Sequence, residues 1–167
     1  MRYKFYLVSL LILVLDHITK WIVGLRLPDN PIEIIPGYLR LSLVFNSGVA
    51  FGLFTAAKSA WNPYVLAVMA VAALIVIFFY GKRMPPERKL LQFGLAITMG
   101  GILGNFIDRI FRGYVVDFIE FHVHESFYFP NFNVADSAIT IGIALLLIDT
   151  ICNPGIGELA QPTADRT

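Results

Sequence analysis

The chain has 167 residues, of which 57% are hydrophobic and only 15% are charged. A soluble domain is about 45–50% apolar and about 25% charged, so this composition excludes a water-soluble globule of this size. The formal net charge of +1 argues against a nucleic-acid-binding protein, which would carry a basic surface. The single cysteine, Cys152, excludes an intramolecular disulfide and a cysteine-based metal cluster.

Four segments are long and apolar enough to be membrane-spanning helices, which need about 20 residues. The first begins like a signal peptide, but charged residues interrupt it and no small-residue cleavage site follows, so we interpret it as a retained helix. The predicted fold is a mainly α membrane protein, with one domain over residues 1–152. The four spans are Phe5–Leu25, Asn62–Tyr80, Leu90–Ile107 and Val134–Cys152.

The two longer connections, at about 26–61 and 108–133, contain more than simple loops. Tyr38–Phe45 and Val115–Val123 are rich in β-branched and aromatic residues, which predicts two strands, and the aromatic run Phe127–Phe129 follows the second of them. We expect these strands to pair into a small β-sheet at the outer surface of the bilayer. Gly52–Trp61 is expected to form a short interfacial helix, because its aromatic residues favour that depth.

Basic residues in short loops predict the orientation. The link Gly81–Lys89 holds four basic residues and two prolines, and Arg2 and Lys4 lie on the same side of the membrane. Both termini are therefore expected in the cytoplasm and both longer connections outside. The polar segment 153–167 is expected to be a disordered cytoplasmic tail.

Polar residues concentrate at one depth of this predicted bundle. An ionisable group within a span is costly and normally faces the bundle interior or a water-filled cavity. The inner half of every span reads as almost purely apolar, so the polar residues indicate one shared site near the outer face. They are Asp16, Lys20, Asn105, Asp108, Arg109, Asp117, Asn133 and Asp136.

Each of these residues also has a structural interpretation. Asp16 and Lys20 have the spacing of a helical ion pair. Asn133 has the position of an N-cap, and Asp136 would then lie in the first turn, where the helix dipole favours a carboxylate. Capping does not explain why both Asp136 and Asp117 approach the membrane interface together.

The strongest chemistry that these residues offer is a pair of carboxylates. No serine peptidase arrangement and no strong metal motif stands out, and His122 with His124 would make only a weak metal site. Two aspartates held close together share one proton, so one activates water while the other polarises a carbonyl, with no metal or cofactor. Asp108 is an alternative member of the pair, although the neighbouring Arg109 favours a permanently charged carboxylate there. Which aspartate holds the proton at rest stays open.

Three other functions compete with this interpretation. A proton-coupled transporter would place acids in both halves of the membrane. A structural membrane protein would use the polar groups for stability or assembly alone. A different intramembrane aspartic peptidase would cut substrates that carry no lipid.

Five sequence blocks, in order along the chain, resemble the signature blocks of lipoprotein signal peptidase (signal peptidase II). Any one of them alone would be a weak signal, but the five together, with four spans between them, are specific. The blocks are Leu15–Lys20, Phe45–Gly52, Gly104–Arg109, Val116–Ile119 and Phe132–Ser137.

The resemblance implies that Asp117 and Asp136 are the catalytic dyad of an aspartic endopeptidase in the bacterial cytoplasmic (inner) membrane. The implied substrate is a prolipoprotein whose cysteine already carries diacylglycerol, and cleavage falls just before that cysteine. It also implies a site near the outer face among membrane lipids, inhibition by globomycin, and no metal; a monomer is expected. Residues that match substrate-binding or supporting positions are Asp16, Lys20, Asn46, Gly101, Asn105, Asp108, Arg109, Asn133 and Ala135.

Overall fold

The computed structural model describes residues 2–27, 31–48, 62–124 and 126–153. The four predicted helices are confirmed, and all four are long and apolar enough to cross a membrane. Three of them run further than hydropathy predicted, because polar residues at their ends are still helical. Their bounds are α1 Arg2–Arg26, α2 Asn62–Arg83, α3 Lys89–Arg112 and α4 Val134–Cys152.

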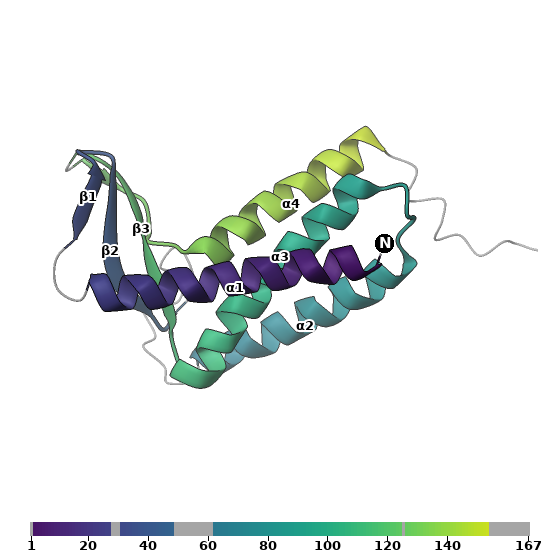
Figure 1. Ribbon diagram of the computed structural model, residues 1–167, viewed down its shortest axis with the longest axis horizontal. Helices are drawn as coiled ribbons and strands as arrows, with labels where there is room; N and C mark the ends of the chain where they lie inside the picture. The colour runs from purple at the N-terminus through teal and green to yellow at the C-terminus, as the bar shows by residue number, and fades with distance from the viewer. Residues whose placement is uncertain (1, 28–30, 49–61, 125, 154–167) are drawn as a thin grey trace, which may run out of the picture.

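Helix α3 lies at the centre of the bundle, packed against each of the other three helices (Figure 1). In its most apolar stretch 61% of the residues are buried, against 11–22% in the other helices. The other helices instead expose large apolar side chains, such as Val68 and Val76 of α2. Such continuous exposed apolar surface is suited to lipid rather than to water.

Glycines allow the neighbouring helices to approach α3 closely. A Cβ atom on Gly100 would lie 2.6 Å from the carbonyl oxygen of Ser9 in α1, and one on Gly101 would lie 2.4 Å from that of Ala135 in α4. The Ser9 hydroxyl uses the same close approach to donate to the carbonyl oxygen of Ala96, at 2.8 Å. In a bilayer, where burial of apolar surface does not drive helices together, such small-residue contacts supply much of the packing energy.

A four-stranded antiparallel sheet in the order β1-β2-β3-β4 lies across one end of the bundle (Figure 1). The two predicted strands are confirmed as β2 and β3. The short strands β1 and β4, of four and two residues, are additions that the sequence did not reveal. The predicted interfacial helix Gly52–Trp61 and the tail from residue 154 lie outside the described residues. The strands are β1 Ile32–Ile35, β2 Leu39–Asn46, β3 Val115–Val123 and β4 Phe127–Tyr128.

The start of α1, the link between α2 and α3, and the end of α4 all lie at the end opposite the sheet (Figure 1). There the prediction of almost purely apolar inner halves overlooked one acid, Asp149 in α4, which is buried with 2% exposure. Its carboxylate pairs with the guanidinium of Arg88, which also donates to the Asp149 carbonyl oxygen at 3.0 Å. This ion pair ties the α2–α3 link to α4.

Replacing Gly100 with alanine should destabilise the protein by about 1–3 kcal/mol, because the new methyl group must push α1 away from α3. Thermal unfolding in detergent measures this change. The matched control is Gly24→Ala, where a Cβ atom would meet nothing within 4 Å. That variant should gain roughly 0.5–1 kcal/mol from the better helix former, and equal destabilisation by both changes would contradict the packing argument.

Replacing Arg88 with methionine should cost roughly 3–5 kcal/mol, since Asp149 is then buried without a partner. Adding Asp149→Leu should restore most of that stability, because two apolar side chains can occupy the site of the ion pair. Unfolding curves of the single and double variants test this. A double variant no more stable than Arg88→Met would show that the loss comes from elsewhere.

Candidate active site

The side chain of Asn133 joins the two aspartates of the predicted dyad. Its Oδ1 accepts from the backbone N–H of Asp136 at 2.9 Å, and the Asp136 carboxylate accepts from the Asn133 backbone N–H at 3.2 Å. This reciprocal arrangement is the capping box of α4. The Nδ2 group of the same Asn133 donates to Asp117 Oδ1 at 2.7 Å, so one residue forms the helix cap and bonds both carboxylates.

The sheet brings Asp117 to the start of α4. Asp117 lies on β3 opposite Val44 of β2, and Asn46 ends β2 opposite Val115. From there Asn46 Nδ2 donates to Asp117 Oδ2 at 2.9 Å. Both oxygens of this 2% exposed carboxylate therefore have an amide donor, which satisfies them although Asp117 is almost fully buried.

Asn105 connects the pair to the helix bundle. Its Nδ2 group donates to Asp136 Oδ1 at 2.7 Å, and its Oδ1 accepts from Asn133 at 3.2 Å and from the Lys20 ammonium at 3.1 Å. The Asn105 amide thus links Lys20 to Asp136 through two hydrogen bonds, one accepted and one donated. All of its partners come from other helices or from the turn before α4.

Lys20 is a buried cation between two buried carboxylates. Its ammonium lies 2.7 Å from Asp16 Oδ2 and 2.8 Å from Asp108 Oδ2. Asp108 also pairs with Arg112 at 3.1 Å, a partner one helical turn away that the sequence reasoning missed. Asp108 is therefore already neutralised by two cations, which supports its role as a brace rather than as the second member of the dyad.

The remaining predicted positions complete the same cluster. Asp16 Oδ1 accepts from the backbone N–H of Ala135 at 2.9 Å, which ties α1 to the first turn of α4. Arg109 Nη1 donates to the carbonyl oxygen of Asn105 at 3.2 Å. Gly101 lies against the backbone of Ala135 with no room for a side chain. Every predicted site residue thus lies in one contiguous cluster, and its catalytic role stays a prediction.

The pKa of Asp117 is raised from 3.8 to about 6, mainly by burial and in smaller part by the neighbouring Asp136 carboxylate. The hydrogen bonds from Asn46 and Asn133 and the charge of Lys20 lower the pKa, but by less than burial raises it. A carboxyl group with a pKa in this range can hold or release a proton under mild conditions. Such a perturbed acid beside a second acid is typical of catalytic carboxylate pairs.

A cavity of about 570 Å³ opens onto the two carboxylates. Asp117, Asp136, Asn46 and Arg109 form its polar wall. Most of the remaining wall is apolar and comes from the sheet, from the turn before α4 and from α4 itself, including Phe121, Phe129, Phe132, Ile139 and Ile141. A few convergent polar groups in a largely apolar cavity are the usual features of a binding site for an amphipathic ligand.

A second polar network on the sheet escaped the sequence reasoning. Glu120 pairs with Arg40 at 2.7 Å and accepts from the Ser42 hydroxyl at 2.7 Å. Asn131 in turn donates to Ser42 Oγ at 2.6 Å, which holds the turn that precedes Asn133. Arg40 and Ser42 are two residues apart on a strand and therefore share one face. This spacing is the feature of the sequence that could have indicated the network.

Within the part of the chain that the structure describes, His122 and His124 have different partners and are not arranged as a metal site. His122 is buried, with its ring stacked on Tyr128 and Nε2 3.7 Å from Glu33. The ring of His124 lies instead beside that of Tyr38. Among the described residues, no group of three or more His, Cys, Asp or Glu side chains is arranged to hold a metal ion.

Solved structures share this fold. Two of them, both described as a bacterial membrane enzyme structure obtained by the in meso method, match over most of their length. The one at 2.3 Å resolution has a TM-score of 0.78 and 26% identity, over 96% of this chain and 94% of that chain. The one at 1.9 Å has a TM-score of 0.77 and 27% identity, over 90% and 94%.

Sequence relatives carry a consistent description. The lipoprotein signal peptidase of Acinetobacter baylyi is 42% identical over 85% of this chain and 78% of its own length. That of Symbiobacterium thermophilum is 41% identical over 86% and 91%, and that of Francisella tularensis subsp. novicida is 34% identical over 87% and 90%. The family model for signal peptidase (SPase) II matches residues 8–152. The chain belongs to the lipoprotein signal peptidase (signal peptidase II) family, a family of multi-pass membrane proteases.

Proposed function

We propose that this peptidase is of the aspartic type and that Asp117 and Asp136 cleave diacylglyceryl-modified prolipoproteins just before the lipidated cysteine. The observation that carries the proposal is that one residue, Asn133, donates to both carboxylates at one end of an amphipathic cavity: its side-chain amide donates to Asp117 and its backbone N–H donates to Asp136. Two acids held by one residue in this way are placed to share a proton and to act on one water molecule.

The surroundings of the two acids favour different roles. Asp136 lies in the first turn of α4 and accepts from Asn105 and from the backbone of Asn133, and these hydrogen bonds and the helix start stabilise its carboxylate against the cost of burial. Asp117 has a pKa of about 6 and holds the proton below that pH. Asp136 then takes a proton from water as the water oxygen attacks the carbonyl carbon, and Asp117 donates a hydrogen bond to the developing oxyanion. When this tetrahedral intermediate collapses, the C–N bond breaks and Asp136 gives its proton to the departing amine nitrogen.

The cavity favours a substrate with a lipid next to its scissile bond. Phenylalanine side chains of the sheet and aliphatic side chains of α4 line it beside the carboxylates, and acyl chains prefer such a wall to water. A diacylated cysteine partitions into the bilayer and brings its peptide bond to the end of the spans. We infer that the sheet end faces the outside of the inner membrane, with both termini in the cytoplasm, because the basic link Gly81–Lys89 is at the other end.

A proton relay across the membrane has less support. Asp149 is a buried acid near the opposite end, but it is engaged by Arg88. A relay would need a chain of titratable groups between Asp149 and the dyad. Over the described part of α4, the residues between Ser137 and Asp149 contain no ionisable side chain.

Asp117→Asn and Asp136→Asn should each lower cleavage of a diacylated lipobox peptide by about 10²–10⁴-fold, because each removes one half of the acid–base pair. The assay uses purified protein in detergent, with product quantified by mass spectrometry. The unlipidated twin of the peptide should be cut far more slowly by the wild type, since it loses the apolar contacts of the cavity.

Glu33→Gln is the matched control, an acid-to-amide change on β1 outside the site, and it should cut normally. Retained activity in either aspartate variant would remove that residue from the dyad and make Asp108 the next candidate. If the folded wild type cuts neither peptide, the proposed substrate class is wrong. Equal cleavage of the two peptides would indicate a peptidase without a lipid requirement.

The kcat/KM of the wild type should fall as the pH rises through about 6, because Asp117 then loses the proton that polarises the carbonyl. Asn46→Ala removes a hydrogen bond that lowers the pKa of Asp117. Its pKa therefore rises, and the fall in kcat/KM should move to higher pH. Plots of kcat/KM against pH for the wild type, Asn46→Ala and the Glu33→Gln control measure the shift. If the fall in kcat/KM of Asn46→Ala stays at the wild-type pH or moves to lower pH, this assignment of the proton is overturned.

A further inference from the structure

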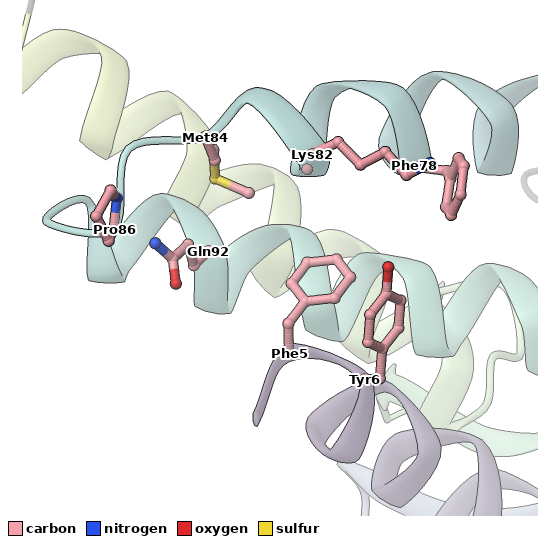
Figure 2. Close-up of a pocket in the computed structure, with 8 residues that line it drawn as sticks. Phe5, Tyr6, Phe78, Lys82, Met84, Pro86 and Gln92 are labelled. Atoms are coloured by element: carbon pink, nitrogen blue, oxygen red, sulfur yellow. The ribbon is translucent and has the colours of Figure 1, made fainter. Parts of the chain in front are cut away.

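A second cavity, of about 320 Å³, lies at the end of the bundle opposite the dyad. Its walls come from the beginning of α1, the end of α2, the link that follows and the beginning of α3 (Figure 2). In Figure 2 the rings of Phe5 and Tyr6 rise from α1 toward α2, where Lys82 lies along the helix to the ring of Phe78. None of these residues takes part in the site around Asp117.

The cavity combines aromatic walls with one cation. Phe5 and Tyr6 meet edge to face, with ring centroids 5.2 Å apart, and Tyr6 and Phe78 remain 45% and 41% exposed. The Lys82 ammonium lies 4.1 Å from the centroid of the Phe78 ring. Within the described residues Lys82 has no carboxylate partner, so the charge is held in position by a ring and is free to accept an anion.

The surroundings select the kind of anion. Lys4, Arg83 and Lys89 are exposed at the same end, and none of them forms an ion pair with a described residue. Aromatic residues that flank an unpaired cation at the end of membrane-spanning helices favour a ligand with an anionic head and an apolar body. A basic pocket between helices at the cytoplasmic side is a site at which anionic lipid headgroups bind.

We propose that this cavity binds one anionic phospholipid of the cytoplasmic leaflet. The phosphate contacts the Lys82 ammonium, and the first acyl methylenes lie against Phe5, Tyr6 and Phe78. The lipid thereby bridges α1 and α2, which the protein itself connects mainly through α3 (Figure 1). The choice of leaflet rests on the proposed orientation, whereas the site itself does not depend on the proposed chemistry of the dyad.

The test is native mass spectrometry of the full chain in detergent, with phosphatidylglycerol and phosphatidylcholine of identical acyl chains in equal amounts. The wild type should retain one phosphatidylglycerol with at least about fivefold preference, the factor that corresponds to one lysine at an anionic surface. Lys82→Gln should lose this preference. Lys89→Gln removes an equal charge at the same end but outside the cavity, and it should keep the preference.

Unfolding temperature and cleavage of the diacylated peptide are measured on both variants, and both should match the wild type without added lipid. Phe78→Leu provides a second variant that keeps the charge but removes the ring, and it should weaken retention. Equal retention of the two lipids by the wild type would overturn the proposal. So would retention of neither lipid, or an equal loss of preference in Lys82→Gln and Lys89→Gln, since surface charge alone would then attract the lipid.

Discussion

The hydrogen bonds of Asn133 are the interaction on which the rest of this site depends. One side chain caps α4, holds Asp117 on the sheet and contacts Asn105 of the central helix. A side-chain cap alone is worth about 1 kcal/mol. Here the cap also sets the distance between sheet and bundle, because the same amide must reach both. The geometry of the carboxylate pair is thus a property of the helix start and not of a mobile loop.

Charge balance explains how so many ionisable groups remain buried together. Lys20 lies between Asp16 and Asp108, and Arg112 supplies a second cation to Asp108. Burying an ion pair is costly unless the geometry is good and the remaining lone pairs are satisfied. Asn105 bonds both Lys20 and Asp136 and so connects these ions to the dyad. Asp16, Lys20 and Asp108 do not line the cavity beside the dyad, which leaves that space for a substrate.

The sequence predicted the spans and the two central strands because length, hydropathy and β propensity are local properties. It also grouped the site residues by depth, and the motif blocks assigned roles to them. It missed β1, since Ile32–Ile35 is too short to carry a pattern, and it overlooked Asp149, whose partner Arg88 lies 61 residues away. The spacing allows Asn133 to be either a cap or a site residue. In the structure one side chain makes both kinds of contact, with Oδ1 at the helix cap and Nδ2 on Asp117, which spacing alone could not indicate.

The sheet and the dyad are built from segments far apart in the order of synthesis. Asn46 reaches Asp117 across 71 residues, and Ala135 of the last helix bonds to Asp16 of the first across 119. A chain emerging from the ribosome therefore holds only one carboxylate of the pair until its fourth helix enters the bilayer. On the proposed assignment of the dyad, proteolytic activity therefore waits for the last helix, and an unfinished copy of the chain lacks one half of its acid–base pair.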